Sequence, residues 1–452
     1  MTEQPDLREL PPDDELRKLL HNEVHARPSA SVQLPALITH VAVLNAGVSL
    51  EQEHAHLCEL PLQNTLQKSD LASQFLILQI PDLVLKWERH TEFTGYTLTQ
   101  ALSPGQGLGA VVPDLCEGRS VPAGWLRSIP GRTVCAIHLV IASSEADDLQ
   151  AWVEQGQRWY GGESVVASSI GNPSQRQATM PGHSMVMTRF RLEDNGFERI
   201  LVIGHRSMSQ SRAGRTAQRL LELETYRLMA LRGFPVAKSL GAQLTQAETQ
   251  LAGITQQLEN KSTSDAALLD HLVALAASVE RIMAENDYRF SATMAYHGLV
   301  SQRIHELREK PISGTQTIGD FMQRRLSPAI ATVAATRQRL QSLSERVARA
   351  SGLLSTRVNI ATEEQNRQLL EKLTKGQALQ LRLQSTVEGL SLAAISYYVV
   401  SLVLYGGKAL KAGGVPIDPE ILAGASIPLV LILVWKIIAK IHTHLRHGEK
   451  PG

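Results

Sequence analysis

The sequence has 452 residues, with 45 lysines and arginines against 44 aspartates and glutamates and a formal net charge of +1. A charge this close to zero excludes a chain that binds nucleic acid over its whole surface, because such proteins are strongly basic. An apolar fraction of 43% excludes a disordered chain. The three cysteines, Cys58, Cys116 and Cys135, are too few and too scattered for a disulfide framework. At ~150 residues per domain the length predicts about three structural units.

The first twenty residues mix charges throughout and contain no apolar stretch of the kind found in secretory signals. The first long uncharged run begins near residue 389. We therefore expect the part of the chain before this run to remain in the cytoplasm.

Residues 1–205 are predicted to form a mixed domain of class α/β or α+β. Short β-branched runs bounded by turn residues predict eight strands, at 37–46, 73–80, 83–90, 92–99, 133–142, 163–170, 184–192 and 198–205. Helical patterns lie between some of them, at 50–60 and 145–160. The stretch 104–131 is rich in glycine and proline and is expected to be a loop. Its three glycines lack the Lys-Ser/Thr pair of a phosphate-binding loop.

Residues 206–388 are predicted to be a helical stalk. Apolar residues recur at alternating spacings of three and four, which is typical of helices that pack along one another in a coiled-coil-like way. The three series are Leu244, Ala247, Leu251, Ile254 and Leu258; Leu268, Leu272, Leu275, Val279 and Ile282; and Val333, Leu340, Leu343, Val347, Ala350 and Leu354. Ser327-Pro328 is a favourable helix start. No proline follows until Pro416, so one long helix is expected to continue through Gly352 and Gly376.

Residues 389–441 are predicted to form two transmembrane helices joined by a short outer loop. Residues 389–407 carry no charge and are long enough to span a bilayer, which needs ~20 residues. Residues 421–435 are shorter, but Lys436 and Lys440 can extend their ammonium groups to the interface. The alternative is a buried helical pair in a soluble core. The tail 442–452 is basic, which fits a cytoplasmic end, so both termini are expected on that side.

The segments 20–44 and 220–235, with the terminal hairpin, carry a resemblance to a known family. The chain resembles the bacterial domain of unknown function 3422 family over nearly its whole length, most specifically at His25, Arg27 and Pro28. Members of that family look like membrane-anchored proteins. The resemblance therefore implies a bacterial inner-membrane protein and adds no chemistry.

A looser, architectural resemblance is to the CorA-type metal ion transporters, which join a cytoplasmic α/β domain through a stalk helix to two spans. Those pentamers carry a Tyr-Gly-Met-Asn motif at the outer end of the first span. Here the corresponding residues are Tyr405, Gly406, Gly407 and Lys408, and Asp418 and Glu420 follow in the outer loop. In an oligomer Lys408 would place a ring of positive charge where the motif has asparagine. Such a ring opposes cation entry.

Histidines near the N-terminus form a weak candidate for a metal site. His21 and His25 are four residues apart, which puts them on one face of a helix. The glutamate between them stands one position too late for the zinc-protease pattern. His40, His54 and His56 could complete a site if they fold nearby. The alternative is that these are ordinary polar residues, with His25 and Arg27 in contact with the sheet.

The most localised basic cluster is Arg206, Arg212, Arg215 and Arg219. The last three share a helical face near the start of a helix, where backbone N–H groups favour anions. The cluster is therefore a candidate site for a phosphate or another small anionic ligand, or for an acidic partner. The alternative is salt bridging to Glu222, Glu224 or another subunit.

These patterns predict a membrane-anchored, two-pass homo-oligomer whose large cytoplasmic domain acts as a scaffold or sensor. The alternative is a CorA-like ion channel or transporter with altered selectivity. No nucleophile elbow or catalytic triad is recognisable, so we expect no enzyme and no cofactor. The expected partners are the lipid bilayer, further copies of the chain and either an ion or a small anionic ligand, with no nucleic acid.

Overall fold

The computed structural model describes residues 14–17, 20, 31–61, 66–102, 121–122, 124–144, 148–172, 182–260, 263–414 and 416–447. The chain divides into two compact units, Met1–Ala350 and Ser351–Gly452. The first unit contains the sheet and the helices that pack on it. The second contains the rest of the long helix α8 and the last helix, α9.

The first unit is built on one nine-stranded mixed sheet, and each of the eight predicted strands is confirmed. Its strands are β1 (Ala36–Leu44), β2 (Phe75–Ile80), β3 (Leu83–Arg89), β4 (Phe93–Ala101), β5 (Arg132–Ser144), β6 (Val166–Ile170), β7 (Ser184–Leu192), β8 (Glu198–His205) and β9 (Lys310–Pro311). Their order in the sheet is β2-β3-β4-β1-β5-β8-β7-β6-β9. Only the β5–β8 pairing is parallel. The two-residue strand β9 was not predicted, because so short a strand carries no periodicity.

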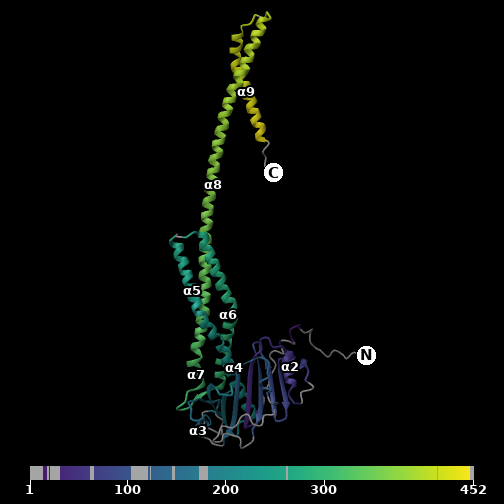
Figure 1. Ribbon diagram of the computed structural model, residues 1–452, viewed down its shortest axis with the longest axis vertical. Helices are drawn as coiled ribbons and strands as arrows, with labels where there is room; N and C mark the ends of the chain where they lie inside the picture. The colour runs from purple at the N-terminus through teal and green to yellow at the C-terminus, as the bar shows by residue number, and fades with distance from the viewer. Residues whose placement is uncertain are drawn as a thin grey trace, which may run out of the picture. The chain divides into compact units, whose positions relative to one another are not determined.

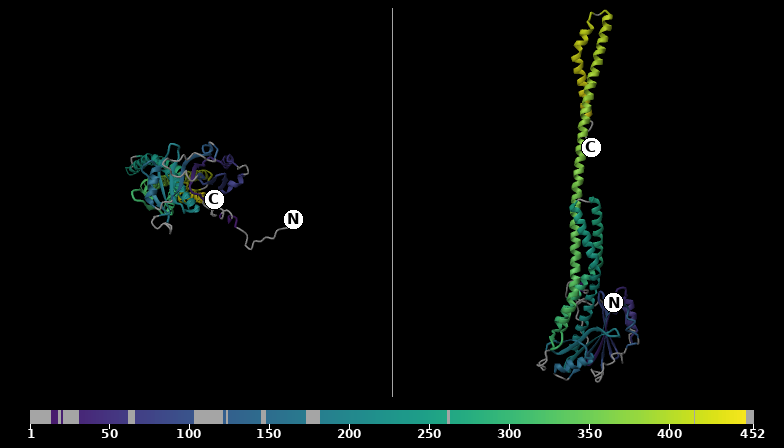
Figure 2. Two further views of the ribbon diagram at one scale, coloured as in Figure 1. Left: turned by 90° about the horizontal axis from the view of Figure 1, so that it is seen from below. Right: turned by 60° about the vertical axis from the view of Figure 1, so that its left-hand side comes forward.

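Both faces of the sheet are buried, which explains its nearly continuous apolar runs. Along β1, Ile38 and Ala42 pack in one core cluster together with residues of α4 (Gln210–Leu231). Val41 and Val43 point the other way and pack with Leu57 of α2 (Leu50–Cys58). On that second face α3 (Leu149–Trp159) buries its two tryptophans. Helix α4 thus covers one face, and α2 and α3 cover the other (Figure 1, Figure 2).

The 3-10 helix η1 (Lys68–Ser73) lies between α2 and β2 along the chain. The helices that follow α4 in the first unit are α5 (Gly233–Asn260), α6 (Asp265–Leu307), α7 (Ile318–Arg325) and the first part of α8 (Ser327–Ala412). Every residue of the three predicted apolar series except the partly buried Leu258 is buried. The helices and their buried faces are confirmed. Their winding into a coiled coil stays a prediction.

The second unit consists of residues 351–412 of α8 and of α9 (Pro419–His447). Helix α8 continues through Gly352 and Gly376 without a break, as predicted. Both helices contain a stretch long and apolar enough to cross a membrane, and only 6% and 17% of these stretches is buried. Tyr397, Leu402 and Leu429 are each about 70% exposed. The transmembrane hairpin and the alternative of a buried pair in a soluble core both stay predictions.

Candidate functional site

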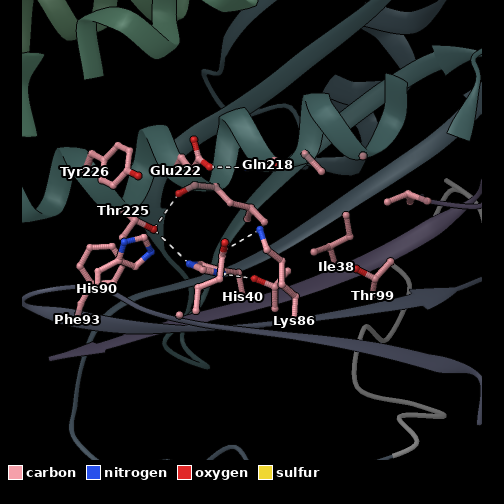
Figure 3. Close-up of a pocket in the computed structure, with 17 residues that line it drawn as sticks. Ile38, His40, Lys86, His90, Phe93, Thr99, Gln218, Glu222, Thr225 and Tyr226 are labelled. Carbon is pink, nitrogen blue, oxygen red and sulfur yellow. Dashed lines mark hydrogen bonds and ion pairs between the residues drawn. The ribbon is translucent and has the colours of Figure 1, made fainter. Parts of the chain in front are cut away.

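A pocket lies between the sheet and helix α4, and the space inside it that a water-sized sphere can reach is about 60 Å³ (Figure 3). The pocket is small and partly open to solvent. The floor is formed by residues of β1, β3 and β4, and the roof by residues of α4. Gly214 and Ala217 are the residues of α4 that leave this room, because larger side chains there would fill the space over the sheet.

Three polar side chains lie side by side on the floor. In the strand register His40 of β1 is opposite Thr97 of β4, and Thr97 is opposite Lys86 of β3. Side chains directly opposite one another on one face of a sheet are neighbours. Gly95, two residues before Thr97, makes room for this row, since a Cβ atom there would lie 3.3 Å from Cε1 of His40.

The neutral state of His40 follows from its burial, and its tautomer follows from its hydrogen bonds. The hydroxyl of Thr225 donates to the carbonyl of Leu221 at 2.8 Å, so its oxygen accepts from Nε2–H of His40 at 3.2 Å. Nδ1 of His40 then accepts from the Thr97 hydroxyl at 2.8 Å. Burial, with the charge of Lys86 second, lowers the pKa of His40 to about 3. His40 is therefore neutral at ordinary pH.

The charged groups of the cavity are paired. Nζ of Lys86 lies 2.7 Å from Oε2 of Glu88, and both side chains are largely buried. On the roof, Glu222 accepts a hydrogen bond of 2.7 Å from Nε2 of Gln218 and forms an ion pair with Arg303 of α6. The cavity thus holds polar groups on helices and strands of the core. The pairs Lys86–Glu88 and Glu222–Arg303 add no net charge to it.

A second polar cluster is buried behind the cavity, on the next turn of α4. Glu224 forms a two-point ion pair with Arg227, with 2.7 Å between Oε2 and Nε. Glu198 of β8 accepts from the hydroxyl of Thr188 at 2.8 Å. Burial and the neighbouring Glu224 raise the pKa of Glu198 well above its ordinary value. One guanidinium thus pairs with one carboxylate, and burial beside Glu224 favours the protonated form of Glu198.

The predicted basic cluster is partly assembled. Arg212, Arg215 and Arg219 lie in the first turns of α4, and their charges, after burial, lower the pKa of His183 to about 4. Arg219 also pairs with Glu306, at 3.3 Å between Nε and Oε2. Within the part of the chain that the structure describes, no carboxylate is at ion-pairing distance from Arg212 or Arg215.

The carboxylates expected to neutralise the cluster have other partners, since Glu222 binds Arg303 and Glu224 binds Arg227. Arg206 is exposed in the turn that precedes α4. The structure therefore brings three of the four predicted arginines together around a histidine. This leaves positive charge that a small anion could neutralise.

Among the histidines considered for a metal site, those that the structure describes do not form one. His21 and His25, with Arg27 and Pro28 of the family motif, lie outside the described residues. His40 faces α4, whereas His56 stacks on Trp125 on the opposite face, with ring centroids 4.3 Å apart. His54 binds the carbonyl of Leu66. Among the described residues no group of three His, Cys, Asp or Glu side chains could hold a metal ion.

The predicted outer-loop residues lie at the ends of the two apolar helices. Tyr405, Gly406, Gly407 and Lys408 occupy the last turns of α8, and Asp418 and Glu420 flank the start of α9. Gly407 lies next to the start of α9, since a Cβ atom built on it would be 3.4 Å from Pro419 and Leu422, an ordinary contact distance. Nζ of Lys408 is 5.8 Å from the ring centroid of Tyr405.

The cavity itself was not predicted from the sequence. A signal exists in β3, where Lys86 and Glu88 alternate with the buried Leu85 and Trp87. Such a pattern is equally typical of a strand with one face in water. Only the packing of α4 over this face shows that the polar side chains line a pocket.

Comparison with known proteins gives a family and nothing further. No curated protein and no solved structure matches the chain. One family model, described as "Protein of unknown function (DUF3422)", matches residues 12–445. This match covers nearly the whole chain and includes both the cavity and the two apolar helices. The chain therefore belongs to the DUF3422 family.

Proposed function

We propose that this protein is a membrane-anchored sensor that binds a small molecule in the cavity between α4 and the sheet. The observation that carries this proposal is the cavity wall, in which His40, Lys86 and Glu222 are held by partners on three different elements. A few polar groups fixed in a mainly apolar cavity are the usual composition of a ligand site.

The polar wall is costly to the fold, which supports a role in binding. Polar and charged groups lose hydration when they are buried, and pairing them only offsets that loss. Lys86 and Glu88 are 11% and 25% exposed, so both have given up most of their contact with water. Apolar side chains at these positions would pack against α4 without this loss. A binding function explains why the floor carries charges instead.

The two apolar helices support anchoring in a membrane. Their apolar side chains are exposed, and in lipid that exposure stabilises the protein instead of destabilising it. Lys436 and Lys440 lie near the end of the apolar part of α9, where they can reach the interface. We place the protein in the bacterial inner membrane, with both termini in the cytoplasm.

We further propose that copies of the chain associate through the charged part of α8. Between residues 351 and 388 this helix exposes several large apolar side chains, including Leu353, Leu373 and Leu383, at 56–73%. Leucines on an exposed helix at such density are typical of a helix that has a partner helix. Association of identical helices would bury them and would make the sensor a homo-oligomer.

The alternative proposal is a CorA-like channel with altered selectivity. It depends on the resemblance at Tyr405 and Gly406, and Lys408 argues against cation entry. Ion flux into liposomes that contain the parent protein or the Lys408→Asn variant separates the two proposals. Flux through the parent would favour transport, and no flux through either protein would favour the sensor.

The binding function is tested by a thermal-shift screen of a metabolite collection against the full chain in lipid nanodiscs. We expect at least one compound to raise the unfolding temperature of the parent. The Ala217→Phe variant fills the cavity and should lose that response. Ala266→Phe, an equal change at an exposed position of α6, should keep it. A response that persists in Ala217→Phe would contradict the proposal.

A further inference from the structure

We infer that the cavity selects an uncharged ligand with a planar aromatic or heterocyclic ring. This inference rests on the proposed binding function and adds the chemical class of the ligand. It is carried by three features of the wall: the pairing of its charges, the neutral state of His40 and the aromatic side chains at one end.

The charges of the wall are already neutralised by neighbouring groups. Lys86 is bound to Glu88 at 2.7 Å, and Glu222 is bound to Arg303 and Gln218. A charged ligand would find no unpaired counterion among these groups. It would have to break an existing pair or remain an uncompensated charge in a largely buried site, and both are unfavourable.

His40 adds no charge either. Its two ring nitrogens are within hydrogen-bond distance of Thr97 and Thr225, and burial favours the neutral ring, in which one nitrogen accepts and the other donates. Protonation would place a buried charge near Lys86. The centre of the floor therefore presents a neutral, hydrogen-bonded surface.

Aromatic side chains gather at one end of the cavity, where Tyr226 of α4 stands over Phe93 of β4 and over His90, which directly follows β3 (Figure 3). The rings of His90 and Phe93 are stacked, with centroids 4.4 Å apart and planes at 25°. Tyr226 lies edge-on to Phe93 at 6.4 Å. At the other end Ile38 and Thr99 line the wall. A flat ring can pack against such aromatic surfaces.

Three probes that share one ring and differ in charge test this inference: 2-naphthol, 2-naphthoate and 2-naphthylmethylammonium. Their binding to the full chain in nanodiscs is measured by isothermal titration at pH 7.5, with empty nanodiscs subtracted. We expect 2-naphthol to bind about tenfold more tightly than either charged probe, and Ala217→Phe to remove its binding while Ala266→Phe retains it.

Two charge variants sharpen the test. Glu88→Gln leaves Lys86 unpaired and should strengthen binding of 2-naphthoate, whereas Lys86→Met leaves Glu88 unpaired and should strengthen binding of the ammonium probe. Lys238→Met and Glu280→Gln, at exposed helix positions outside the cavity, should change neither preference. The three-probe comparison in the parent stands even if one cavity variant does not fold.

The outcomes separate this inference from the proposal on which it rests. If the parent prefers a charged probe, or if Glu88→Gln and Lys86→Met leave the preferences unchanged, the uncharged class is wrong although the cavity still binds. If no probe binds, or if Ala217→Phe changes nothing, the binding function of the cavity is contradicted as well.

Discussion

His40 Nε2 lies 3.2 Å from Oγ1 of Thr225, and this hydrogen bond joins the central sheet to helix α4 across 185 positions of sequence. Both side chains are buried. The same threonine is bound to the carbonyl of Leu221, one turn earlier in α4. The bond therefore fixes the tautomer of His40 and the position of the roof over the floor of the cavity.

Replacing Thr225 by valine should destabilise the first unit by about 1–3 kcal/mol, because it leaves Nε2–H of His40 without an acceptor in a buried site. Urea unfolding followed by tryptophan fluorescence measures this, since Trp87, Trp125, Trp152 and Trp159 all belong to that unit.

Thr249→Val is the matched control for this change. Thr249 of α5 makes the same kind of bond to the carbonyl one turn earlier, at 2.8 Å to Thr245, but it is exposed. Its replacement should change the free energy of unfolding by no more than about 0.5 kcal/mol. Equal effects of the two variants would show that the bond to His40 contributes nothing.

Acid should destabilise the first unit through His40. The pKa of this histidine is lowered from 6.5 to about 3 by burial, so between these values the unfolded chain binds a proton that the folded chain does not. The free energy of unfolding therefore falls as the pH falls through this window, by about 2 kcal/mol between pH 7 and pH 5. His40→Gln should show a smaller fall, measured by urea unfolding at both pH values.

His56 and His183, whose pKa values are lowered to about 4 mainly by burial, act in the same direction and should leave part of the slope in His40→Gln. His271→Gln, at an exposed position of α6, should keep the full slope. The explanation fails if His40→Gln and His271→Gln have the same slope.

Glu198 and Glu224 should respond differently to the same substitution. Because the pKa of Glu198 is raised by burial, the folded chain holds a proton above pH 4.5 that the unfolded chain has lost, so the free energy of unfolding falls as the pH rises. Glu198→Gln keeps an uncharged group and should flatten this fall. Glu224→Gln removes the partner of the buried Arg227 and should cost about 3 kcal/mol at pH 7. Similar costs would contradict the assignment of the proton to Glu198.

The arginines around His183 should control its titration. Arg212→Gln with Arg215→Gln removes two of the charges that lower the pKa of His183, so that pKa should rise from about 4. Inorganic phosphate added to the parent protein should raise it too if an anion binds there. Nuclear magnetic resonance of labelled histidine follows both changes.

The double variant Arg281→Gln with Arg349→Gln alters two exposed arginines elsewhere in the first unit and is the control. It should leave the titration of His183 unchanged. A titration unaffected by phosphate would show that the cluster is not an anion site.

Much of the fold could be predicted because its patterns are local. In β1 the alternation of Ile38 and Ala42 with Val41 and Val43 is visible in nine consecutive residues. The three apolar series of the helices are equally local. The register of the sheet was not predictable, since β5 pairs with β8 across more than fifty residues.

The cavity could not be predicted from the sequence for a related reason. Lys86, Thr97 and Glu222 are unremarkable in the sequence, and only the crossing of α4 over β1, β3 and β4 places them around one space. The arginines of α4 were predictable because they lie within two turns of one helix. The histidines were not, because His40 and His56 point to opposite faces of the sheet.

The central claim is that the cavity holds a small molecule, and it is tested most directly by mass spectrometry of compounds that copurify with the full chain. Parent, Ala217→Phe and Ala266→Phe proteins are purified from the same cells in nanodiscs and extracted. We predict a compound that is enriched with the parent and with Ala266→Phe and depleted with Ala217→Phe. The same set of compounds at equal amounts in all three proteins would contradict the claim.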